Sequence, residues 1–332
     1  MKKLILGTTE LKSRVILAPM AGVTDLPFRK IVREFGDFLM FSEMVASQAV
    51  IRNVMRTHKM MDNADDPLTS VQIVGADPAV MADAAKLSYD LGAKFLDINM
   101  GCPVKKIVKS EAGSALMKNE KLASQIIEAV VNAVPIPVTL KMRLGWDLEH
   151  KNAPTIARIA EKMGIQMITI HGRTRSQLYS GKANWTDIRA VKEVVNIPVI
   201  ANGDITDAES AKKALEESLA DGIMVGRGAL GKPWILSDID KFIKTGVITT
   251  STLTNQQKYE IARRHLEYMQ EFYEAYTAIK LSRKVLIYYC HGTPNAAQYR
   301  QKINTIQTIP AIFDLLAEIF QHSIACNNSP LF

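Results

Sequence analysis

Eight short apolar runs recur through the first three quarters of the chain, and each is followed by a stretch with helical periodicity. Near-continuous apolar runs of this length are typical of parallel strands that are buried on both faces. The runs cover residues 15–18, 38–42, 70–74, 95–99, 138–142, 167–171, 199–202 and 222–225. The helical stretches between them include residues 78–91, 120–133, 153–163 and 207–217. Eight strand–helix units predict an α/β fold of the (β/α)8 TIM-barrel type over about residues 10–245.

An open, doubly wound sheet is the alternative fold for alternating strands and helices. Its dinucleotide-binding version carries G-x-G-x-x-G directly after the first strand. The residues that follow the first apolar run read Pro19-Met20-Ala21-Gly22-Val23, so this fingerprint is absent. The barrel is therefore the favoured prediction.

The character of the sequence changes after Thr249, where a polar linker ends the alternation. Beyond the linker, four helical patterns occur without a strand pattern, over residues 256–276, 278–289, 297–301 and 311–323. We therefore predict three parts. They are a catalytic TIM-barrel domain over residues 1–248, a C-terminal all-helical domain over residues 249–326, and a flexible tail over residues 327–332.

Charge and cysteine content limit the kinds of partner and the compartment. The formal net charge of +7 suggests an anionic partner, such as nucleic acid, a phosphorylated ligand or a membrane surface, although an unspecialised basic surface is equally compatible. The three cysteines form no C-x-x-C and have no metal-ligand spacing, which favours a reducing, cytoplasmic setting without a metal site. The start of the chain turns polar by Thr8, so no signal peptide is expected, and no stretch approaches the ~20 apolar residues of a membrane span.

Polar side chains gather at the ends of the predicted strands. The working residues of barrel enzymes sit at the carboxyl ends of the strands, which meet at one mouth. In strand order these ends carry Pro19-Met20-Ala21, Glu43, Gln72, Asn99 with Cys102, Lys141 with Arg143, His171 with Arg173, Asn202-Gly203-Asp204, and Gly226-Arg227-Gly228. Glycine turns after the seventh and eighth strands are a common place for a phosphate, and an arginine there suits a phosphate oxygen. The sequence therefore predicts a phosphate-bearing cofactor across the mouth.

One thiol stands out at this mouth. Cys102 lies in a turn directly after the fourth predicted strand, between Gly101, which permits a tight backbone, and Pro103, which ends the strand. Lys105 and Lys106 follow at once and place positive charge nearby. The pattern leaves two roles open for the thiol, nucleophile or proton donor.

Six motifs occur along the chain in order. They are Ala18-Pro19-Met20-Ala21-Gly22-Val23-Thr24-Asp25, Asn99-Met100-Gly101-Cys102-Pro103, Lys141-Met142-Arg143, His171-Gly172-Arg173-Thr174-Arg175, Asn202-Gly203-Asp204 and Gly226-Arg227-Gly228. Together they resemble the tRNA-dihydrouridine synthase family, most closely its bacterial B subfamily. The likeness covers roughly residues 5–320, including the helical part. It implies an oxidoreductase that reduces uridines in tRNA to 5,6-dihydrouridine.

The resemblance also implies the cofactors, the partner and the roles of the site residues. FMN would be the bound cofactor and NADPH, or NADH, the reductant, with tRNA as the substrate. Separately from the resemblance, a cytoplasmic location and a monomeric state are expected. Pro19, Met20 and Ala21 would lie under the flavin ring, Gln72 and Lys141 at its polar edge, and His171 near the ring or the ribityl chain. Asn202, Gly203, Asp204, Gly226 and Arg227 would enclose the ribityl phosphate. Asn99, Arg143 and Arg173 would place the nucleotide, and Cys102 would be the catalytic proton donor.

The chemistry of this reaction fits a thiol acid. Reduction of the uracil C5=C6 double bond needs a hydride at C6 and a proton at C5. Reduced flavin provides the hydride, and a thiol with a pKa of about 8.5 stays mostly protonated at pH 7. Cys102 is therefore predicted to act as a general acid toward C5, and the neighbouring lysines are expected to face phosphates.

Two other functions are compatible with parts of the pattern. An FMN-dependent barrel reductase of a free pyrimidine or another small molecule would share the mouth but would not need the helical domain. A non-catalytic tRNA-binding protein would share the basic surface.

In the helical domain, Arg283 and Lys284 offer positive charge for contacts with tRNA. The tyrosines there, Tyr288, Tyr289 and Tyr299, are either base-stacking faces or, as we favour, part of the core.

Overall fold

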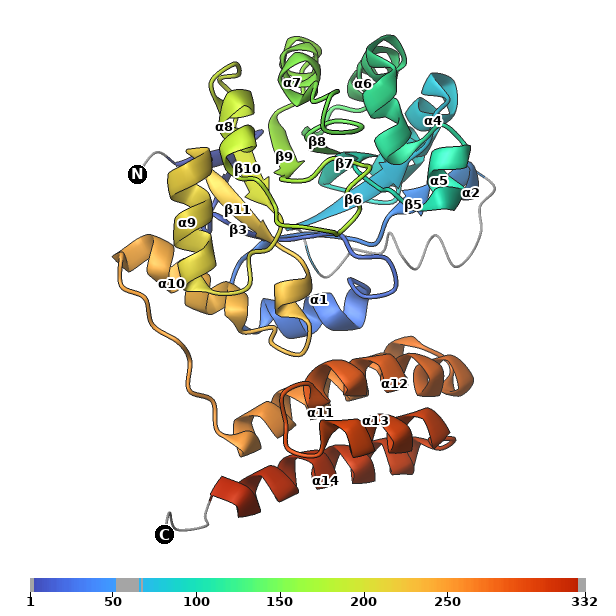
Figure 1. The fold of residues 1–332 in the computed structure, drawn as a ribbon. Helices are drawn as coiled ribbons and strands as arrows, with labels where there is room; N and C mark the ends of the chain where they lie inside the picture. Colours follow the sequence, from blue (N-terminus) through green and yellow to red (C-terminus); the bar gives the residue numbers. More distant parts are fainter. Residues whose placement is uncertain (1–2, 52–65, 67, 328–332) are drawn as a thin grey trace. The chain divides into compact units, whose positions relative to one another are not determined.

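The computed structural model describes residues 3–51, 66 and 68–327, with side chains up to residue 320. The chain forms two compact units (Figure 1). The barrel unit contains residues 1–25, 37–228 and 236–249, and the helical unit contains residues 26–36, 229–235 and 250–332. Two short pieces of the barrel sequence thus belong to the helical unit. The predicted tail over residues 327–332 lies, apart from Asn327, outside the described residues.

Eight parallel strands close into a barrel in the first unit (Figure 1). They are β3 (Val15–Leu17), β4 (Leu39–Phe41), β6 (Thr69–Val74), β7 (Phe95–Met100), β8 (Val138–Arg143), β9 (Met167–His171), β10 (Val199–Asn202) and β11 (Gly222–Val225). Each pairs with its neighbour in chain order, and β11 pairs with β3 to close the ring. The two-residue strand β5 (Val45–Ala46) pairs with β6 in addition. The predicted TIM barrel is confirmed.

A short hairpin that the sequence did not reveal precedes the barrel. β1 (Leu4–Leu6) and β2 (Thr9–Leu11) pair antiparallel around Gly7, whose φ of +63° suits glycine. The hairpin leucines are buried in one apolar cluster with side chains of several barrel strands. The Gly7 amide donates to the side-chain oxygen of Gln166, which directly precedes β9. The hairpin therefore covers the end of the barrel where the strands begin.

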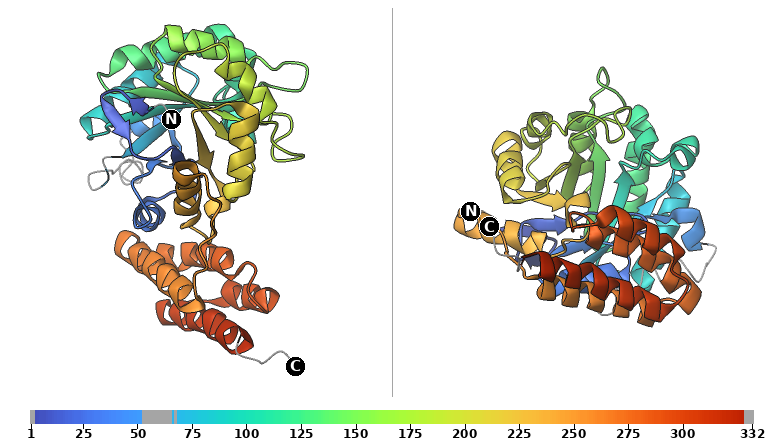
Figure 2. Two further views of the ribbon diagram at one scale, coloured as in Figure 1. Left: turned by 90° about the vertical axis from the view of Figure 1, so that its left-hand side faces the viewer. Right: turned by 60° about the horizontal axis from the view of Figure 1, so that its bottom comes forward.

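Helices surround the strands of the barrel unit (Figures 1 and 2). They are α2 (Ser47–Ile51), α4 (Pro78–Asp90), α5 (Lys105–Lys109), α6 (Glu120–Ala133), α7 (Ala153–Lys162), α8 (Thr186–Lys192), α9 (Ala208–Ser218) and α10 (Ile235–Thr245), with short 3-10 turns η1 (Gly113–Lys118) and η2 (Arg227–Ala229). Capping residues fix where some of these helices begin. The Asp77 side chain accepts hydrogen bonds from two backbone amides at the start of α4, and Asp207 forms a capping box with Ser210 at the start of α9. The four predicted helical stretches agree with α4, α6, α7 and α9 within one residue at each end.

The helical unit encloses a core of its own. Its helices are α1 (Leu26–Arg33), α11 (Asn255–Phe272), α12 (Ala275–Cys290), α13 (Ala296–Thr305) and α14 (Ile309–Asn327), and α11 to α14 lie side by side (Figure 2). Ile31, Leu266, Leu286 and Leu316 are buried together in this core. Within the described residues, no helix combines the length and apolar character needed to cross a bilayer.

Two predictions on the helical part can be compared with the structure. The predicted helix over residues 256–276 is wrong at its end, because Tyr273 and Glu274 are extended and separate α11 from α12. A helical period could not reveal this break, since both residues are compatible with a helix. Tyr289 and Tyr299 are 5% and 3% exposed, so the packing interpretation is confirmed for these two tyrosines.

Candidate active site

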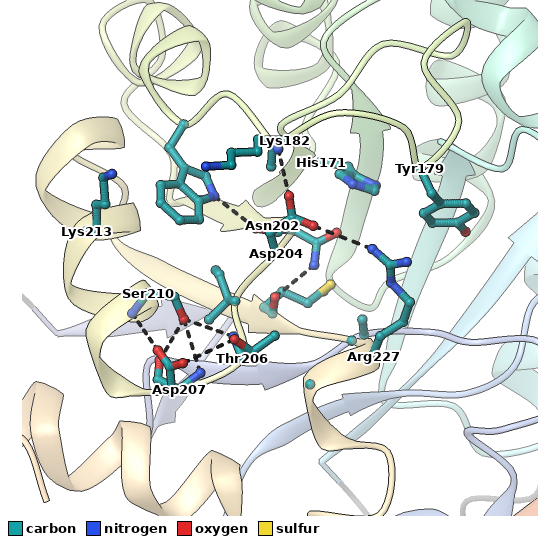
Figure 3. A pocket seen from close by; sticks show the side chains of 18 of the residues that line it. His171, Tyr179, Lys182, Asn202, Asp204, Thr206, Asp207, Ser210, Lys213 and Arg227 are labelled. Carbon is teal, nitrogen blue, oxygen red and sulfur yellow. Dashed lines mark hydrogen bonds and ion pairs between the residues drawn. The ribbon is translucent and has the colours of Figure 1, made fainter. Parts of the chain in front are cut away.

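A cavity of about 910 Å³ opens at the carboxyl ends of the barrel strands (Figure 3). Nine of the predicted cofactor residues line it: Pro19, Met20, Lys141, His171, Asn202, Gly203, Asp204, Gly226 and Arg227. The other predicted site residues, Ala21, Gln72, Asn99, Cys102, Arg143 and Arg173, are outside its lining. The cavity has the size and the few convergent polar groups of a cofactor site. Predicted residues from five strand ends therefore line one common pocket.

Lys141 crosses from β8 toward β10 in the barrel interior. It is 9% exposed, and its ammonium group donates to Oδ1 of Asn202 at 3.1 Å. Burial lowers the pKa of Lys141 to about 8, with repulsion from Arg143 adding to the effect and attraction to Asp97 and Cys102 opposing it. Lys141 thus remains mostly protonated at pH 7, and it offers the pocket a cation that can stabilise negative charge.

His171 ends β9 and lines the same cavity (Figure 3). Burial holds the pKa of His171 well below its ordinary value, and repulsion from Lys141, Arg143, Arg173 and Arg227 adds to this effect. The imidazole is therefore neutral at physiological pH. A neutral ring presents one donor and one acceptor, which suits a contact with a polar ligand edge.

Two glycines line one end of the cavity, and the lack of a side chain has a different consequence at each. Gly203 has a φ of +113°, and a Cβ there would lie 2.8 Å from the His171 ring and 2.9 Å from Cβ of Ala183. At Gly226 a Cβ would meet only ordinary contacts, the nearest at 3.6 Å from Cβ of Ala18. The backbone conformation and the close neighbours therefore require glycine at position 203, whereas the lack of a side chain at Gly226 leaves room for a ligand in the pocket.

Asp204 sits among cations at this glycine-lined end (Figure 3). Two guanidinium nitrogens of Arg173 donate to its two carboxylate oxygens at 2.9 and 2.6 Å, and the Ala183 amide donates at 2.8 Å. Burial alone would raise the pKa of Asp204, but the bonds from Arg173 and Ala183 hold it below its ordinary value. Arg227 lies 3.5 Å away and is 58% exposed. Arg173 therefore neutralises the carboxylate, and Arg227 can turn to an incoming phosphate.

Arg143 and Arg173, which were predicted to place the nucleotide, are buried and hold the backbone. Nε of Arg143 donates to the oxygen of Gly101 at 2.8 Å. Both arginines also donate to carbonyl oxygens of the loop after β9, those of Thr174, Leu178, Ser180 and Gly181. The two side chains thus tie the Cys102 turn and this loop to the barrel. A direct contact of either with a nucleotide stays a prediction.

The turn that carries Cys102 is held from two sides. Oδ1 of Asn99 accepts from the amides of Gly101 and Cys102 at 3.1 and 2.9 Å. From the other side, Ser114 donates its hydroxyl and its amide to the backbone oxygen of Cys102 at 2.9 and 3.1 Å. The thiol is therefore presented by a backbone that its neighbours hold in place.

The environment of Cys102 favours the protonated thiol. Burial raises the pKa of Cys102, and the Val104 amide, Arg143 and Lys141 only partly oppose this effect. The lysines of α5, which follow in sequence, are exposed to solvent. A thiol with a raised pKa is a poor nucleophile at neutral pH but can still give its proton to a reacting carbon. This environment favours the proton-donor role, which stays a prediction for Cys102.

Tyr179 is a lining residue that the sequence analysis missed. It lies in the loop after β9, with its ring 4.8 Å from the Arg227 guanidinium carbon, 5.6 Å from that of Arg143 and 6.2 Å from the His171 ring (Figure 3). The ring is 55% exposed at the pocket and could face a planar ligand. No strand-end pattern could find it, because it lies eight residues beyond the end of β9.

The fold and this pocket define a class, that of (β/α)8-barrel enzymes with a polar pocket at the carboxyl ends of the strands. The family model described as dihydrouridine synthase matches residues 16–323. The chain belongs to the dihydrouridine synthase family, which confirms the family predicted from the six motifs.

Curated relatives match nearly the full length of the chain. A probable tRNA-dihydrouridine synthase of Rickettsia bellii is 49% identical over 317 residues, covering 95% of this chain and 97% of the relative. The tRNA-dihydrouridine synthase B of Pseudomonas aeruginosa is 42% identical over 308 residues, covering 92% of each. The protein of that name from Vibrio parahaemolyticus is 42% identical, covering 96% of this chain and 98% of the relative. The predicted likeness to the B subfamily agrees with these names.

Two solved structures share the fold at low sequence identity. Histamine dehydrogenase from Rhizobium sp. 4-9 has a TM-score of 0.57 and 12% identity, covering 98% of this chain and 64% of that chain. An old yellow enzyme homologue from Zymomonas mobilis has a TM-score of 0.51 and 14% identity, covering 76% of this chain and 94% of that one. These similarities support the barrel architecture alone.

Proposed function

We propose that this protein reduces uridine in tRNA to 5,6-dihydrouridine, with FMN as its cofactor and NADPH as the reductant. Family membership and the names of near-full-length relatives support the reaction. The observation that carries the proposal is the Cys102 thiol, which is partly buried and held in the turn directly after β7, and whose pKa burial raises. Saturation of the C5=C6 bond requires such a proton donor.

FMN suits the pocket at both of its ends. The backbone at Gly203 and Gly226, with the exposed guanidinium of Arg227, would hold the ribityl phosphate. Lys141 and the neutral His171 would contact the polar edge of the ring or the ribityl chain. Further pocket residues proposed for FMN are Pro19, Met20, Asn202 and Asp204, and Ala21 and Gln72 stay predictions as ring contacts. When bound, FMN supplies the hydride for C6.

Side chains of the protein would donate the proton and stabilise the thiolate that remains. Cys102 gives its proton to C5 of the uracil, and the resulting thiolate is stabilised by Arg143 and Lys141, the two cations that act on this group. A proton from solvent then restores the thiol. Asn99, which holds the turn, would also help to place the base.

The glycines of the pocket provide a test of FMN binding with a matched pair. Gly203→Ala should destabilise the protein by about 1–3 kcal/mol, because its φ and the nearby imidazole exclude a side chain. Gly226→Ala should fold normally but weaken FMN binding about tenfold, a loss of about 1.4 kcal/mol. Thermal unfolding without flavin and titration with FMN measure the two effects separately. If Gly226→Ala and wild type bound FMN with equal affinity, the proposal that the FMN phosphate lies beside Gly226 would be wrong.

Transfer RNA would reach the pocket with its target base turned out of the stack. The exposed lysines of α5, directly after the Cys102 turn, are proposed to meet phosphates. In the helical unit, Tyr276 is 70% exposed and has the Lys280 ammonium 4.1 Å from its ring centroid. We propose this pair as a stacking and phosphate contact, a role that buried Tyr289 and Tyr299 cannot have.

Mapping of dihydrouridine in cellular tRNA tests the proposed reaction. Deletion of the gene should remove dihydrouridine from one or more tRNA positions, and the wild-type gene should restore it. Purified protein should be yellow and should oxidise NADPH when the deletion-strain tRNA is added, with NADH as the comparison reductant. An unchanged modification map, or turnover of free uracil without activity on tRNA, would refute the proposal and favour a small-molecule reductase.

A further inference from the structure

One buried carboxylate takes no part in the proposed reaction. Asp97 lies in the middle of β7 and is 0% exposed. Its register partners are Gln72 on β6 and Thr139 on β8, and both direct polar groups at it. A charge in a protein interior is strongly disfavoured unless it is hydrogen-bonded. The role of this aspartate therefore lies in its hydrogen bonds and not in the packing of the core.

Hydrogen bonds link Asp97 to the catalytic turn in one continuous chain. Nε2 of Gln72 donates to Oδ2 of Asp97 at 2.6 Å, and Nδ2 of Asn99 donates to Oε1 of Gln72 at 2.8 Å. Oδ1 of Asn99 then accepts from the amides of Gly101 and Cys102 at 3.1 and 2.9 Å. Gln72 is 0% exposed and Asn99 is 7% exposed, so water does not substitute freely for these bonds.

The two ends of this chain fix the same orientation of both amides. An ionised carboxylate can only accept, so Gln72 must turn its NH2 group to Asp97 and its oxygen to Asn99. The backbone N–H groups of residues 101 and 102 can only donate, so Asn99 must turn its oxygen to them. A reversal of either amide would leave two donors or two acceptors facing each other. The acceptor at Asp97 therefore determines which way the Asn99 amide points.

We propose that Asp97 is a positioning residue that, through Gln72 and Asn99, holds the turn of Cys102 in the geometry for proton transfer. The same chain sets the orientation of the Gln72 and Asn99 amides, one predicted to face the flavin and the other the uracil. The consequence for uridine reduction rests on the proposed function. The effect on the turn itself does not, and it can be measured on the thiol alone.

The hydrogen-bonded chain should tolerate a change in the charge of Asp97. Burial raises the pKa of Asp97 to about 6, while the Thr139 hydroxyl, the Gln72 amide and the charge of Lys141 oppose the shift. Lys141 is the charged neighbour that acts on this carboxylate, and it remains protonated in this range. Above about pH 6, Asp97 accepts on both oxygens. Below it, a proton on Oδ1 can be donated to the Thr139 hydroxyl while Oδ2 still accepts from Gln72, so the chain is kept.

Two substitutions of Asp97 separate its shape from its hydrogen bonding. Asp97→Asn can keep an oxygen toward Gln72 and turn its NH2 group to the Thr139 hydroxyl, so the chain survives without the charge. Asp97→Leu keeps the branched shape of the side chain but removes the acceptor. Thr169→Val, which removes a buried hydroxyl from β9 outside the chain, is the control for a general loss of core polarity.

The rate of alkylation of Cys102 at pH 8, followed by mass spectrometry of its peptide, is the first readout. Asp97→Leu should react up to about tenfold faster, because a loosened turn loses the burial that raises the thiol pKa, and one pKa unit changes the thiolate fraction tenfold. Asp97→Asn and Thr169→Val should react at the wild-type rate. Wild-type reactivity in folded Asp97→Leu, or equal effects of Asn and Leu, would overturn the proposal.

Turnover on tRNA is the second readout. Asp97→Leu should lower kcat/KM about 100-fold through misplacement of the turn. Protonated Asp97 and Asp97→Asn can both keep an oxygen toward Gln72, so wild type and Asp97→Asn should have the same pH profile near pH 6. An acidic loss of activity near pH 6 in wild type that Asp97→Asn does not share would mean that the charge, and not the acceptor, is required, and it contradicts the proposed role. If no protein of the set reduces tRNA while the alkylation pattern holds, the proposed substrate fails and the positioning role stands.

Discussion

Cys102→Ala is expected to stop uridine reduction while the protein stays folded and retains FMN. The side chain is partly buried on a turn whose backbone is held by Asn99 and Ser114, and neither contact uses the thiol. Removal of a general acid typically lowers a rate by about 10²–10⁴-fold. Single-turnover reduction of a tRNA transcript by the NADPH-reduced protein, together with the flavin absorption spectrum, measures the loss at constant cofactor content.

A matched thiol outside the barrel unit provides the control. Cys290→Ala removes a buried thiol from α12 in the helical unit and should leave the single-turnover rate unchanged. Cys102→Ser should fail like Cys102→Ala, because a hydroxyl holds its proton too tightly to serve as an acid near pH 7. Retention of more than about a tenth of the wild-type rate in Cys102→Ala would mean that another group protonates C5.

The barrel could be predicted because its strands are buried on both faces. Runs such as residues 138–142 remain apolar or are interrupted only by the inward-pointing Thr139 and Lys141, which a continuous-run pattern tolerates. The hairpin of β1 and β2 has three residues in each strand, too few for a periodic signal. Membership of residues 26–36 and 229–235 in the helical unit depends on long-range packing around Ile31 and Trp234, which no local pattern encodes.

The residues that line the pocket could be predicted from the strand pattern, but the contacts that hold the surrounding loops could not. Lys141 lies two residues before the end of β8, and His171 and Asn202 end β9 and β10, and barrel topology brings such positions to one mouth. The supporting contacts depend on the course of loops instead. That Arg143 binds carbonyls rather than solvent follows from how the loop after β9 folds back, and the strand pattern contains no information on this. Tyr179 was missed for the same reason.

Arg173→Leu is expected to destabilise the barrel unit by about 3 kcal/mol. The guanidinium is 2% exposed and pairs with both oxygens of Asp204, and it also binds the backbone oxygens of Ser180 and Gly181. Loss of one partner of a buried pair costs about 3–5 kcal/mol, and the lower end applies because Asp204 keeps some contact with solvent. Denaturant unfolding monitored by the tryptophan signal measures the difference.

Arg227→Leu removes a second arginine from the same carboxylate and should behave in the opposite way. Arg227 is 58% exposed and 3.5 Å from Asp204, so this pair contributes about 0–1 kcal/mol to stability, whereas the lost cation should weaken FMN binding. The stabilisation by Arg173 should also fade below about pH 4: the pKa of Asp204 is depressed in the folded protein, so the benefit exists above the unfolded pKa and is lost as Asp204 protonates. Arg227→Leu keeps the Arg173–Asp204 pair, so its stability should fall at low pH as that of wild type does, and the small difference between the two proteins should stay constant. If both variants unfolded alike and bound FMN alike, the division between a structural and a ligand-facing arginine would be wrong.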